Sequence, residues 1–298
     1  MNKEIFIEYF RRKYNIKECR DLLANARKNS ITPFYKSYMG LLNVHTGLRD
    51  TQYEEQTEYL ENILNNIDIN IDFQEYEELK KIYKILKNPK YLPKNLNKNI
   101  DVILAYAQEK IQEVNRGLDE IIHLMFRGLL KQEGLGTPFG RYTYDANKRS
   151  GQITINFLTS FIFCIRYEIN FKSFLINTYA HELAHAYNHL GQDKDGGNRY
   201  WKNFHEVDLY IKEGLAEFYS FQFAQKYQQK YPYLIECFEK TYNDQNFSEE
   251  YYEYRNWENT LEEVYMSMII ARRQDIKDIN RFRRLLQENK KVLRRFEN

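Results

Sequence analysis

Two histidines four residues apart are the part of this sequence whose types and spacing most directly suggest chemistry. They stand in the pentapeptide His181-Glu182-Leu183-Ala184-His185. On a helix, side chains four positions apart point to the same side, about 6 Å apart along the axis, so both imidazoles can bind one metal ion. Neutral imidazoles suit Zn²⁺, and Glu182 is then placed to take a proton from a water that the metal activates. The spacing predicts a zinc site with Glu182 as the general base.

The residues around this pentapeptide are apolar on nearly every side of the expected helix. They are Leu175, Ile176, Tyr179, Ala180, Leu183, Ala184 and Ala186. A half-exposed helix with polar residues on its outer face is the simpler interpretation, but this composition opposes it. Buried imidazoles and carboxylates that lack partners cost several kcal/mol each. A bound metal ion would supply those partners.

A catalytic zinc ion needs a third protein ligand and one open position. Downstream, Glu213 and Glu217 lie four residues apart on a second expected helix, with the small residues Gly214 and Ala216 between them. The small side chains would let the two helices approach closely. Glu213 could then reach the metal, while Glu217 hydrogen-bonds the outward nitrogen of a ligating histidine. Taken alone, the pair would also fit a solvated acidic helix face.

The His-Glu-x-x-His helix, followed by a helix carrying Glu-Gly-Leu-Ala-Glu-Phe from Glu213, resembles the gluzincin branch of the zincin metallopeptidases, in particular the peptidase-MA-like group. The resemblance covers roughly residues 152–227. It implies His181, His185 and Glu213 as metal ligands, Glu182 as base and Glu217 as the partner of a ligand. It also implies that the strand from residue 152 to 157 borders the cleft, where an extended substrate could pair with it.

Two alternatives for the third ligand remain open, His189 and Glu217, while the metzincin pattern is disfavoured. The metzincin pattern requires a Gly three residues and a His six residues after the second histidine, where this sequence has Asn188 and Gly191. His189 shares the face of the two histidines but lies about another 6 Å along the axis, which suits packing or hydrogen bonding better. Glu217 could be the ligand, with Glu213 merely nearby.

The amino-terminal half has the spacing of helices. From residue 3 to about 133, apolar residues recur every three or four positions, and the longest such run, Ile100 to Leu129, follows Pro93. Gly134 to Pro138 then interrupts the pattern. We therefore expect a helical region over residues 1–133 and a zincin-like metallopeptidase domain with carboxy-terminal helices over residues 134–298.

The second half predicts one β-hairpin and several helices. Arg141 to Tyr144 and Gln152 to Phe157 have the composition of paired strands, and they are the only clear sheet signal. One helix should start between residues 170 and 173 and end at Leu190 before Gly191, and another should run from about Val207 to Tyr227. With two or more helices after these, the fold class is mainly α, in the α+β sense, with a small sheet.

The composition sets limits on location and partners. The 298 residues carry 44 Lys and Arg against 42 Asp and Glu, so global charge makes no case for nucleic acid or membrane partners. The most apolar stretch, residues 153–165, is shorter than a bilayer span of about 20 residues and contains polar side chains. No signal peptide is recognisable, and we expect a cytoplasmic protein. Cys19, Cys164 and Cys237 lack metal-ligand spacing and predict reduced, buried thiols.

Peptide hydrolysis also needs a hydrogen-bond donor for the tetrahedral oxygen. No histidine follows His205, so a later His is excluded, and the sequence does not choose among the other candidates. These are His205, Tyr200, Tyr210, Tyr219, Tyr251, Tyr252, Tyr254, Arg255 and Tyr265. The last five belong to a segment that could fold over the cleft.

The expected function is hydrolysis of peptide bonds in a protein or peptide substrate. One rival is a non-catalytic binding or regulatory protein with a structural zinc site, although such a site has no use for Glu182. Another is a nucleic-acid-associated protein that uses the basic terminal helix, where ten Lys or Arg lie between Arg272 and Arg295. The acidic segment from Phe247 to Tyr265 could neutralise that helix within the fold. The helical region over residues 1–133 could select substrate, block the cleft or bind a regulatory partner.

Overall fold

The computed structural model describes residues 3–42, 51–54, 72–88, 99–129, 138–145, 147, 150–193, 201–241 and 247–294. Its helices are α1 (Lys3–Lys13), α2 (Ile16–Ala26), the π-helical turn η1 (Arg27–Ile31), α3 (Thr32–Met39), α5 (Phe73–Leu86), α6 (Ile100–Leu129), α7 (Phe157–Tyr167), α8 (Phe171–Leu190), η3 (Phe204–Glu206), α9 (Leu209–Tyr227), α10 (Leu234–Thr241), η4 (Glu249–Asn256), α11 (Leu261–Gln274) and α12 (Ile279–Arg294). Its strands are β1 (Leu41–Leu42), β2 (Gln52–Glu54), β3 (Gly140–Asp145), β4 (Ser150–Asn156) and β5 (Gly191–Gln192). The fold is mainly α with a small mixed sheet, as the sequence predicted.

The sheet has the order β2-β4-β3. The predicted hairpin is present, with β3 and β4 antiparallel from Gly140 opposite Ile155 to Asp145 opposite Ser150. Phe157 does not end the second strand, because it is the first residue of α7. The sequence did not predict β2, which pairs in parallel with β4, nor the short antiparallel pair β1 and β5. The three-residue β2 and the two-residue β1 and β5 are too short to produce a recognisable alternating pattern.

Helix α7 was also missed from the sequence. Its residues from Phe157 to Ile165 are all buried, so it has no polar face and no helical periodicity in its hydrophobic pattern. A buried helix of this kind resembles a buried strand in sequence. Within the described ranges, no helix combines the length and apolar character needed to cross a membrane.

Helices α8 and α9 form the centre of the molecule, and their starts are set by side-chain caps. The Asn170 side chain accepts a hydrogen bond from the Ser173 backbone at the start of α8, and Asp208 does the same for Tyr210 at the start of α9. Both predicted ranges agree with these helices to within two residues. At the end of α8, a Cβ on Gly191 would lie 2.4 Å from the Tyr187 carbonyl oxygen, so only glycine permits this close turn.

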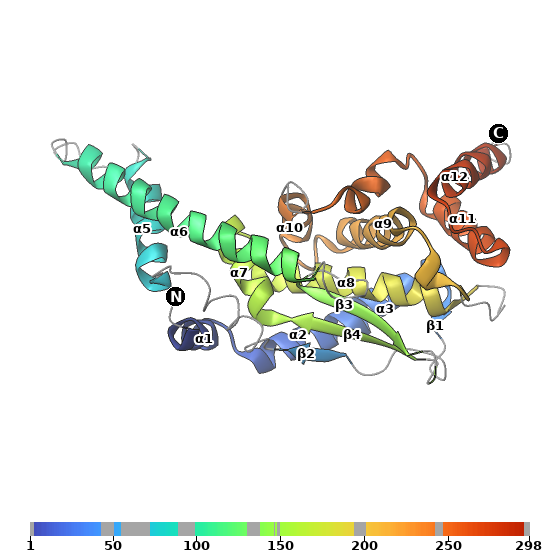
Figure 1. The fold of residues 1–298 in the computed structure, drawn as a ribbon, viewed down its shortest axis with the longest axis horizontal. Coiled ribbons are helices and arrows are strands. Elements are labelled where there is room, and N and C mark those ends of the chain that lie inside the picture. Colours follow the sequence, from blue (N-terminus) through green and yellow to red (C-terminus); the bar gives the residue numbers. More distant parts are fainter. Residues whose placement is uncertain are drawn as a thin grey trace.

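The amino-terminal helices pack directly against α8. The Tyr35 hydroxyl of α3 donates a hydrogen bond of 2.7 Å to the carbonyl oxygen of Ala180, one residue before the histidine pentapeptide. Its ring also packs on Tyr187, with 5.3 Å between ring centroids. Figure 1 shows α2 and α3 running beneath α8. The predicted boundary at residues 133 and 134 lies outside the described residues.

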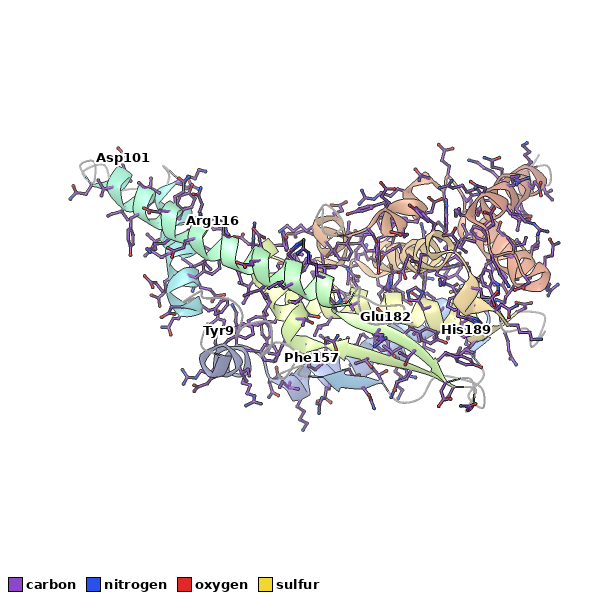
Figure 2. All side chains as sticks on the ribbon, viewed as in Figure 1. Tyr9, Asp101, Arg116, Phe157, Glu182 and His189 are labelled. Carbon is purple, nitrogen blue, oxygen red and sulfur yellow. The ribbon has the colours of Figure 1, made fainter. Side chains whose placement is uncertain are left out.

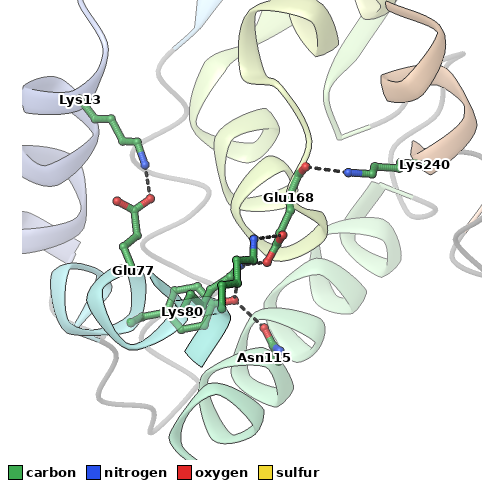
Figure 3. A network of polar contacts seen from close by, with 8 residues as sticks. Lys13, Glu77, Lys80, Asn115, Glu168 and Lys240 are labelled. Atoms are coloured by element: carbon green, nitrogen blue, oxygen red, sulfur yellow. Dashed lines mark hydrogen bonds and ion pairs between the residues drawn. The ribbon is translucent and has the colours of Figure 1, made fainter. Parts of the chain in front are cut away.

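Helices α5 and α6 form an arm that extends from the body (Figure 1). Glu168, the residue that follows α7, joins the arm to the body through polar contacts, and it also contacts α10. Its carboxylate binds Lys80 at 2.6 Å and Lys84 at 2.7 Å, and its backbone oxygen accepts a hydrogen bond from Lys240 (Figure 3). Tyr76 donates to Asn115 across α5 and α6 at 2.6 Å. The base of the arm is thus fixed against the body by charge as well as packing.

The acidic segment around η4 and the basic helix α12 pair with each other, as their charges suggested. The Glu253 carboxylate is 2% exposed and accepts two hydrogen bonds from Arg283, at 2.8 Å and 2.7 Å. Lys290 binds Glu258 at 3.1 Å. At least part of the basic face of α12 is therefore engaged within the chain. The three cysteines are buried and free, which agrees with the prediction of reduced thiols.

Candidate metal centre

Helix α8 carries the histidine pentapeptide through the interior of the protein. His181, Glu182 and His185 are all buried, at 5%, 0% and 0% exposure. Figure 2 places Glu182 near the middle of the molecule and His189 farther along the same helix. Helix α9 packs along α8 and brings Glu213, which is 3% exposed, opposite the two histidines.

Three side-chain atoms converge at one point between these helices. Nε2 of His181 and Nε2 of His185 are 3.0 Å apart, and Oε2 of Glu213 lies 3.2 Å from the first and 3.4 Å from the second. In a tetrahedral zinc site with bonds of about 2.0–2.1 Å, the ligand atoms are about 3.3 Å apart. The triangle thus has the dimensions of one face of a zinc coordination shell. Within the described residues, these three form the group suited to a metal ion.

Glu217 lies one helical turn beyond Glu213 and contacts the opposite side of the first histidine. Its Oε1 is 2.8 Å from Nδ1 of His181, which makes the two groups an ion pair when the imidazole is protonated. An acceptor at Nδ1 keeps the proton on that nitrogen and leaves Nε2 free to bind a metal. The structure therefore gives Glu213 the position of a ligand and Glu217 that of the histidine's partner.

The carboxylates and imidazoles of the centre favour binding of a cation. Burial alone would lower the pKa of His181, but the carboxylates of Glu217 and Glu213 raise it well above its usual value. Burial would likewise raise the pKa of Glu213, yet His185 and His181 hold it far below its usual range. Oε2 of Glu213 has no hydrogen bond of good geometry among the described residues. A divalent ion would satisfy this oxygen and both imidazoles together, so the residues present fit a zinc ion.

Glu182 is the least satisfied group of the centre. Neither of its carboxylate oxygens accepts a hydrogen bond of standard geometry within the described part of the chain, and the nearby backbone N–H of Tyr142 only partly offsets the effect of burial. Burial raises the pKa of Glu182 to about 8, and the neighbouring carboxylates oppose the attraction of His181. Strand β3 passes close to it, since a Cβ on Gly140 would lie 2.8 Å from Oε1 of Glu182. A carboxylate of this kind binds protons readily near neutral pH, as a general base must.

Tyr251 is the residue of this site that the sequence could not select. It lies on η4, and its ring stacks on the ring of His181 with 6.0 Å between centroids. Burial, followed by the charges of Glu213, Glu182 and Glu217, raises the pKa of Tyr251 well above its usual value. Its hydroxyl therefore keeps its proton and can donate it in a hydrogen bond. Nothing in the sequence distinguishes Tyr251, because the chain has 26 tyrosines.

Two other candidates, His189 and His205, make contacts outside the centre. Nδ1 of His189 is 3.0 Å from the Tyr142 hydroxyl, and its ring stacks on Phe204. This agrees with the packing or hydrogen-bonding role expected for His189. The His205 side chain is 77% exposed and pairs with Glu206. Tyr200 lies outside the described residues.

One implication of the family resemblance needs correction. Strand β4 was expected to border the cleft and to pair with an extended substrate. It lies between β2 and β3, and its backbone pairs with both of them. From Thr154 to Asn156 both sides of β4 are already paired, so an extended substrate has no free edge along this part of the strand. The strand that reaches Glu182 is instead β3, through Gly140.

The position of each group in the centre comes from two helices and one 3₁₀ segment that are distant in sequence. Helix α8 supplies the histidines and the base, α9 supplies the two carboxylates, and η4 supplies the tyrosine. Comparison with family models, with curated proteins and with solved structures found no match to this chain.

Proposed function

We propose that this protein is a zinc-dependent metallopeptidase that resembles the gluzincins and hydrolyses peptide bonds of a protein or peptide substrate. The observation that carries the proposal is the triangle of His181 Nε2, His185 Nε2 and Glu213 Oε2, with Glu182 buried beside it. Two imidazoles and one carboxylate form a donor set that suits zinc and leaves a coordination position open. A structural site normally closes all four positions with protein ligands.

A zinc ion in this centre would polarise the scissile carbonyl and activate a water molecule. Glu182 takes the proton of the attacking water and later passes it to the leaving amine, for which its raised pKa is suited. Glu217 holds His181 in the tautomer that binds through Nε2. Tyr251, which lies over His181, donates a hydrogen bond to the oxygen that becomes negatively charged in the tetrahedral intermediate.

One experiment distinguishes a zinc peptidase from a non-catalytic zinc protein and from a nucleic-acid-associated protein. The protein is analysed for bound metal, and its cleavage of a mixed peptide library is compared with that of Glu182→Gln. We expect about one zinc ion per chain in both proteins and loss of cleavage by at least a hundredfold in the variant. Glu262→Gln, at an exposed position in α11, is the matched control and should cleave normally. Equal cleavage by wild type and Glu182→Gln, or failure of the wild type to retain a divalent metal, would refute the proposal.

A location in the cytoplasm is part of the same proposal. Its support is the set of three buried free thiols, Cys19, Cys164 and Cys237. Thiols that stay unpaired are typical of a reducing compartment. Mass spectrometry of protein alkylated under denaturing conditions, after isolation from its own cells, should find all three cysteines reduced.

A further inference from the structure

A small cavity lies directly beside the metal centre, between α8, α9 and α10. Its lining residues are Phe139, Phe174, Asn177, Thr178, His181, Glu182, Ser220, Phe238, Thr241 and Phe247. A predicted metal ligand and the predicted base thus form part of its wall. Any side chain that fills the cavity must belong to a residue adjoining the bond under attack.

The cavity is small and its walls are largely aromatic. Four phenylalanines line it, and Phe139 packs on Phe174 and Phe247, with ring centroids 5.0 Å and 6.3 Å away. Its volume is about 30 Å³, counted as the space open to the centre of a water-sized sphere. One water needs roughly 10–15 Å³ on this measure, so the space suits about two or three heavy atoms. A long or aromatic side chain does not fit without displacing the walls.

Three buried polar side chains of the cavity, Asn177, Ser220 and Thr241, offer hydrogen-bond acceptors to a ligand. Nδ2 of Asn177 donates to the Leu234 carbonyl at 2.9 Å, which leaves Oδ1 of this amide without a partner among the described residues. The Ser220 hydroxyl donates to the Glu217 carbonyl at 3.1 Å. The Thr241 hydroxyl donates to the Cys237 carbonyl at 2.8 Å. The two hydroxyls therefore have their single protons engaged and only lone pairs available, while Asn177 offers Oδ1 as an acceptor and keeps a second N–H on Nδ2.

Oδ1 of Asn177, which has no hydrogen-bond donor among the described residues, indicates what kind of group the cavity can bind. Asn177 is 9% exposed, and a buried acceptor without a donor costs free energy that a bound ligand can recover. Its orientation is not free, because the bond from Nδ2 to Leu234 fixes which side of the amide carries the oxygen. The third hydroxyl of the lining, on half-buried Thr178, belongs to a side chain whose methyl group faces Gly140.

We propose that this cavity receives the side chain of a threonine or serine next to the scissile bond, so that the substrate class is a peptide with a small hydroxylated residue at the cleavage site. This inference rests on the proposed peptidase function. The hydroxyl donates to Oδ1 of Asn177, and the methyl group of threonine packs against the phenylalanines. Valine has the same shape but leaves Oδ1 unsatisfied, so the site discriminates between the two by hydrogen bonding alone.

The test compares peptides that differ only by threonine or valine at each of the two positions flanking one bond. Cleavage by the zinc-loaded enzyme gives kcat/KM, and calorimetric titration into zinc-loaded Glu182→Gln gives binding without turnover. We expect threonine to be favoured about tenfold in both measurements at one of the two positions, the value of one net hydrogen bond. Equal or stronger binding and cleavage of the valine peptides overturns the inference, and so does failure of every peptide to bind.

Variants of the cavity assign the preference to Asn177. Asn177→Leu keeps the size of the side chain and should make threonine and valine peptides equivalent. Asn29→Leu, the same change at an exposed position outside the cavity, should keep the tenfold preference. If Asn177→Leu does not fold, Asn177→Ala removes the same amide oxygen with a smaller side chain and should reduce the preference at least threefold. An unchanged preference in the folded cavity variants refutes the role of this acceptor.

The two proposals fail in different ways. If zinc-loaded Glu182→Gln binds the threonine peptide selectively but the wild type cleaves nothing, the binding preference of the cavity for threonine stands and the peptidase function is wrong. If the wild type cleaves peptides without regard to threonine, the function stands and the cavity inference is wrong.

Discussion

At the scale of single residues, two glutamates four positions apart differ only in what each faces. Glu213 directs Oε2 at both imidazoles, whereas Glu217 directs Oε1 at the far nitrogen of His181. Glu217→Gln should therefore leave all three metal ligands in place. The variant should, however, favour less strongly the tautomer of His181 that carries its proton on Nδ1 and leaves Nε2 free for the metal. Such changes typically lower metal affinity by about 10–100-fold.

Competition with a chelating dye measures that loss of zinc affinity. Glu236→Gln, on the exposed side of α10, is the control and should bind zinc as the wild type does. A variant Glu217→Gln with unchanged affinity would mean that His181 is oriented by other contacts. Loss of all zinc binding would instead make Glu217 a ligand, the alternative left open by the sequence.

His189 should make the protein sensitive to acid. Burial, followed by the positive charge of Arg272, lowers the pKa of His189 from 6.5 to about 3. The unfolded chain takes up this proton near pH 6.5 and the folded protein does not, so stability is present above pH 6.5 and falls as the pH drops towards 3. Between pH 7 and pH 5, His189 alone should cost about 2 kcal/mol.

Urea denaturation of the wild type and His189→Gln at both pH values checks this cost. Glutamine has no proton to gain in this range, so the stability of the variant should fall by about 2 kcal/mol less than that of the wild type. Contributions from all other residues are common to the two proteins and cancel from the difference. Parallel losses of stability in the two proteins would show that His189 takes up its proton in the folded state.

At the scale of elements, sequence patterns predicted the helices and strands that local signals define. They missed the elements that are defined by tertiary packing or by pairing with a distant strand. Helices α8 and α9 were predicted well, because polar caps and flanking Gly or Pro mark their ends. The hairpin of β3 and β4 was predicted from alternating side chains. The buried helix α7 has no polar face to reveal its period, and β2 is defined only by its pairing with β4.

The same distinction applies to the candidate site. The histidines, Glu182, Glu213 and Glu217 could be proposed from sequence because each pair lies one helical turn apart. Tyr251 reaches His181 only because η4 folds over α9, and no local pattern encodes that arrangement. The spacing rule therefore found the residues on a shared helix and missed the one brought in by tertiary packing.

The position of η4 depends on a buried carboxylate. Glu253 accepts hydrogen bonds from Arg283 of α12 and, at 3.0 Å, from the indole nitrogen of Trp257. The Trp257 ring covers Gly214, the residue after Glu213, where a Cβ would lie 2.8 Å from the indole. Helix α12 is thereby linked to the metal centre through η4.

Arg283→Gln should loosen this link. The arginine side chain is 43% exposed, so the expected loss is moderate, about 1–2 kcal/mol, and comes from the unpaired charge left on Glu253. Because Tyr251 lies on the same segment, kcat should fall more than zinc affinity does. Arg284→Gln, at the exposed neighbouring position, is the control for both measurements. A fall in stability equal to that of the control would mean that η4 is held by other contacts.

At the scale of the whole molecule, the amino-terminal helices are part of the same core as the metal centre. Their residues that are at most 1% exposed include Phe6, Phe10, Leu23, Ile31, Phe34 and Tyr35. The ring of Phe10 packs on Phe161 and Phe171, with centroids 5.1 Å and 6.0 Å away, so it touches both α7 and α8. The hydrogen bond from Tyr35 to Ala180 lies in this interface.

The segment from residue 134 to 298 should therefore fail to fold cooperatively when expressed alone. Burying one large apolar side chain contributes roughly 1.5–3 kcal/mol, while a whole domain is stable by only about 5–15 kcal/mol. Losing the helices that pack on α7 and α8 would remove most of this stability and expose the apolar face of α8, the helix that carries His181 and His185.

The full chain should melt in one calorimetric transition, whereas the shortened chain should show none and should bind a dye specific for exposed apolar surface. A cooperative transition in the shortened chain, with zinc bound, would instead make residues 1–133 a separable region, and its role would then be regulation of the cleft rather than support of α8.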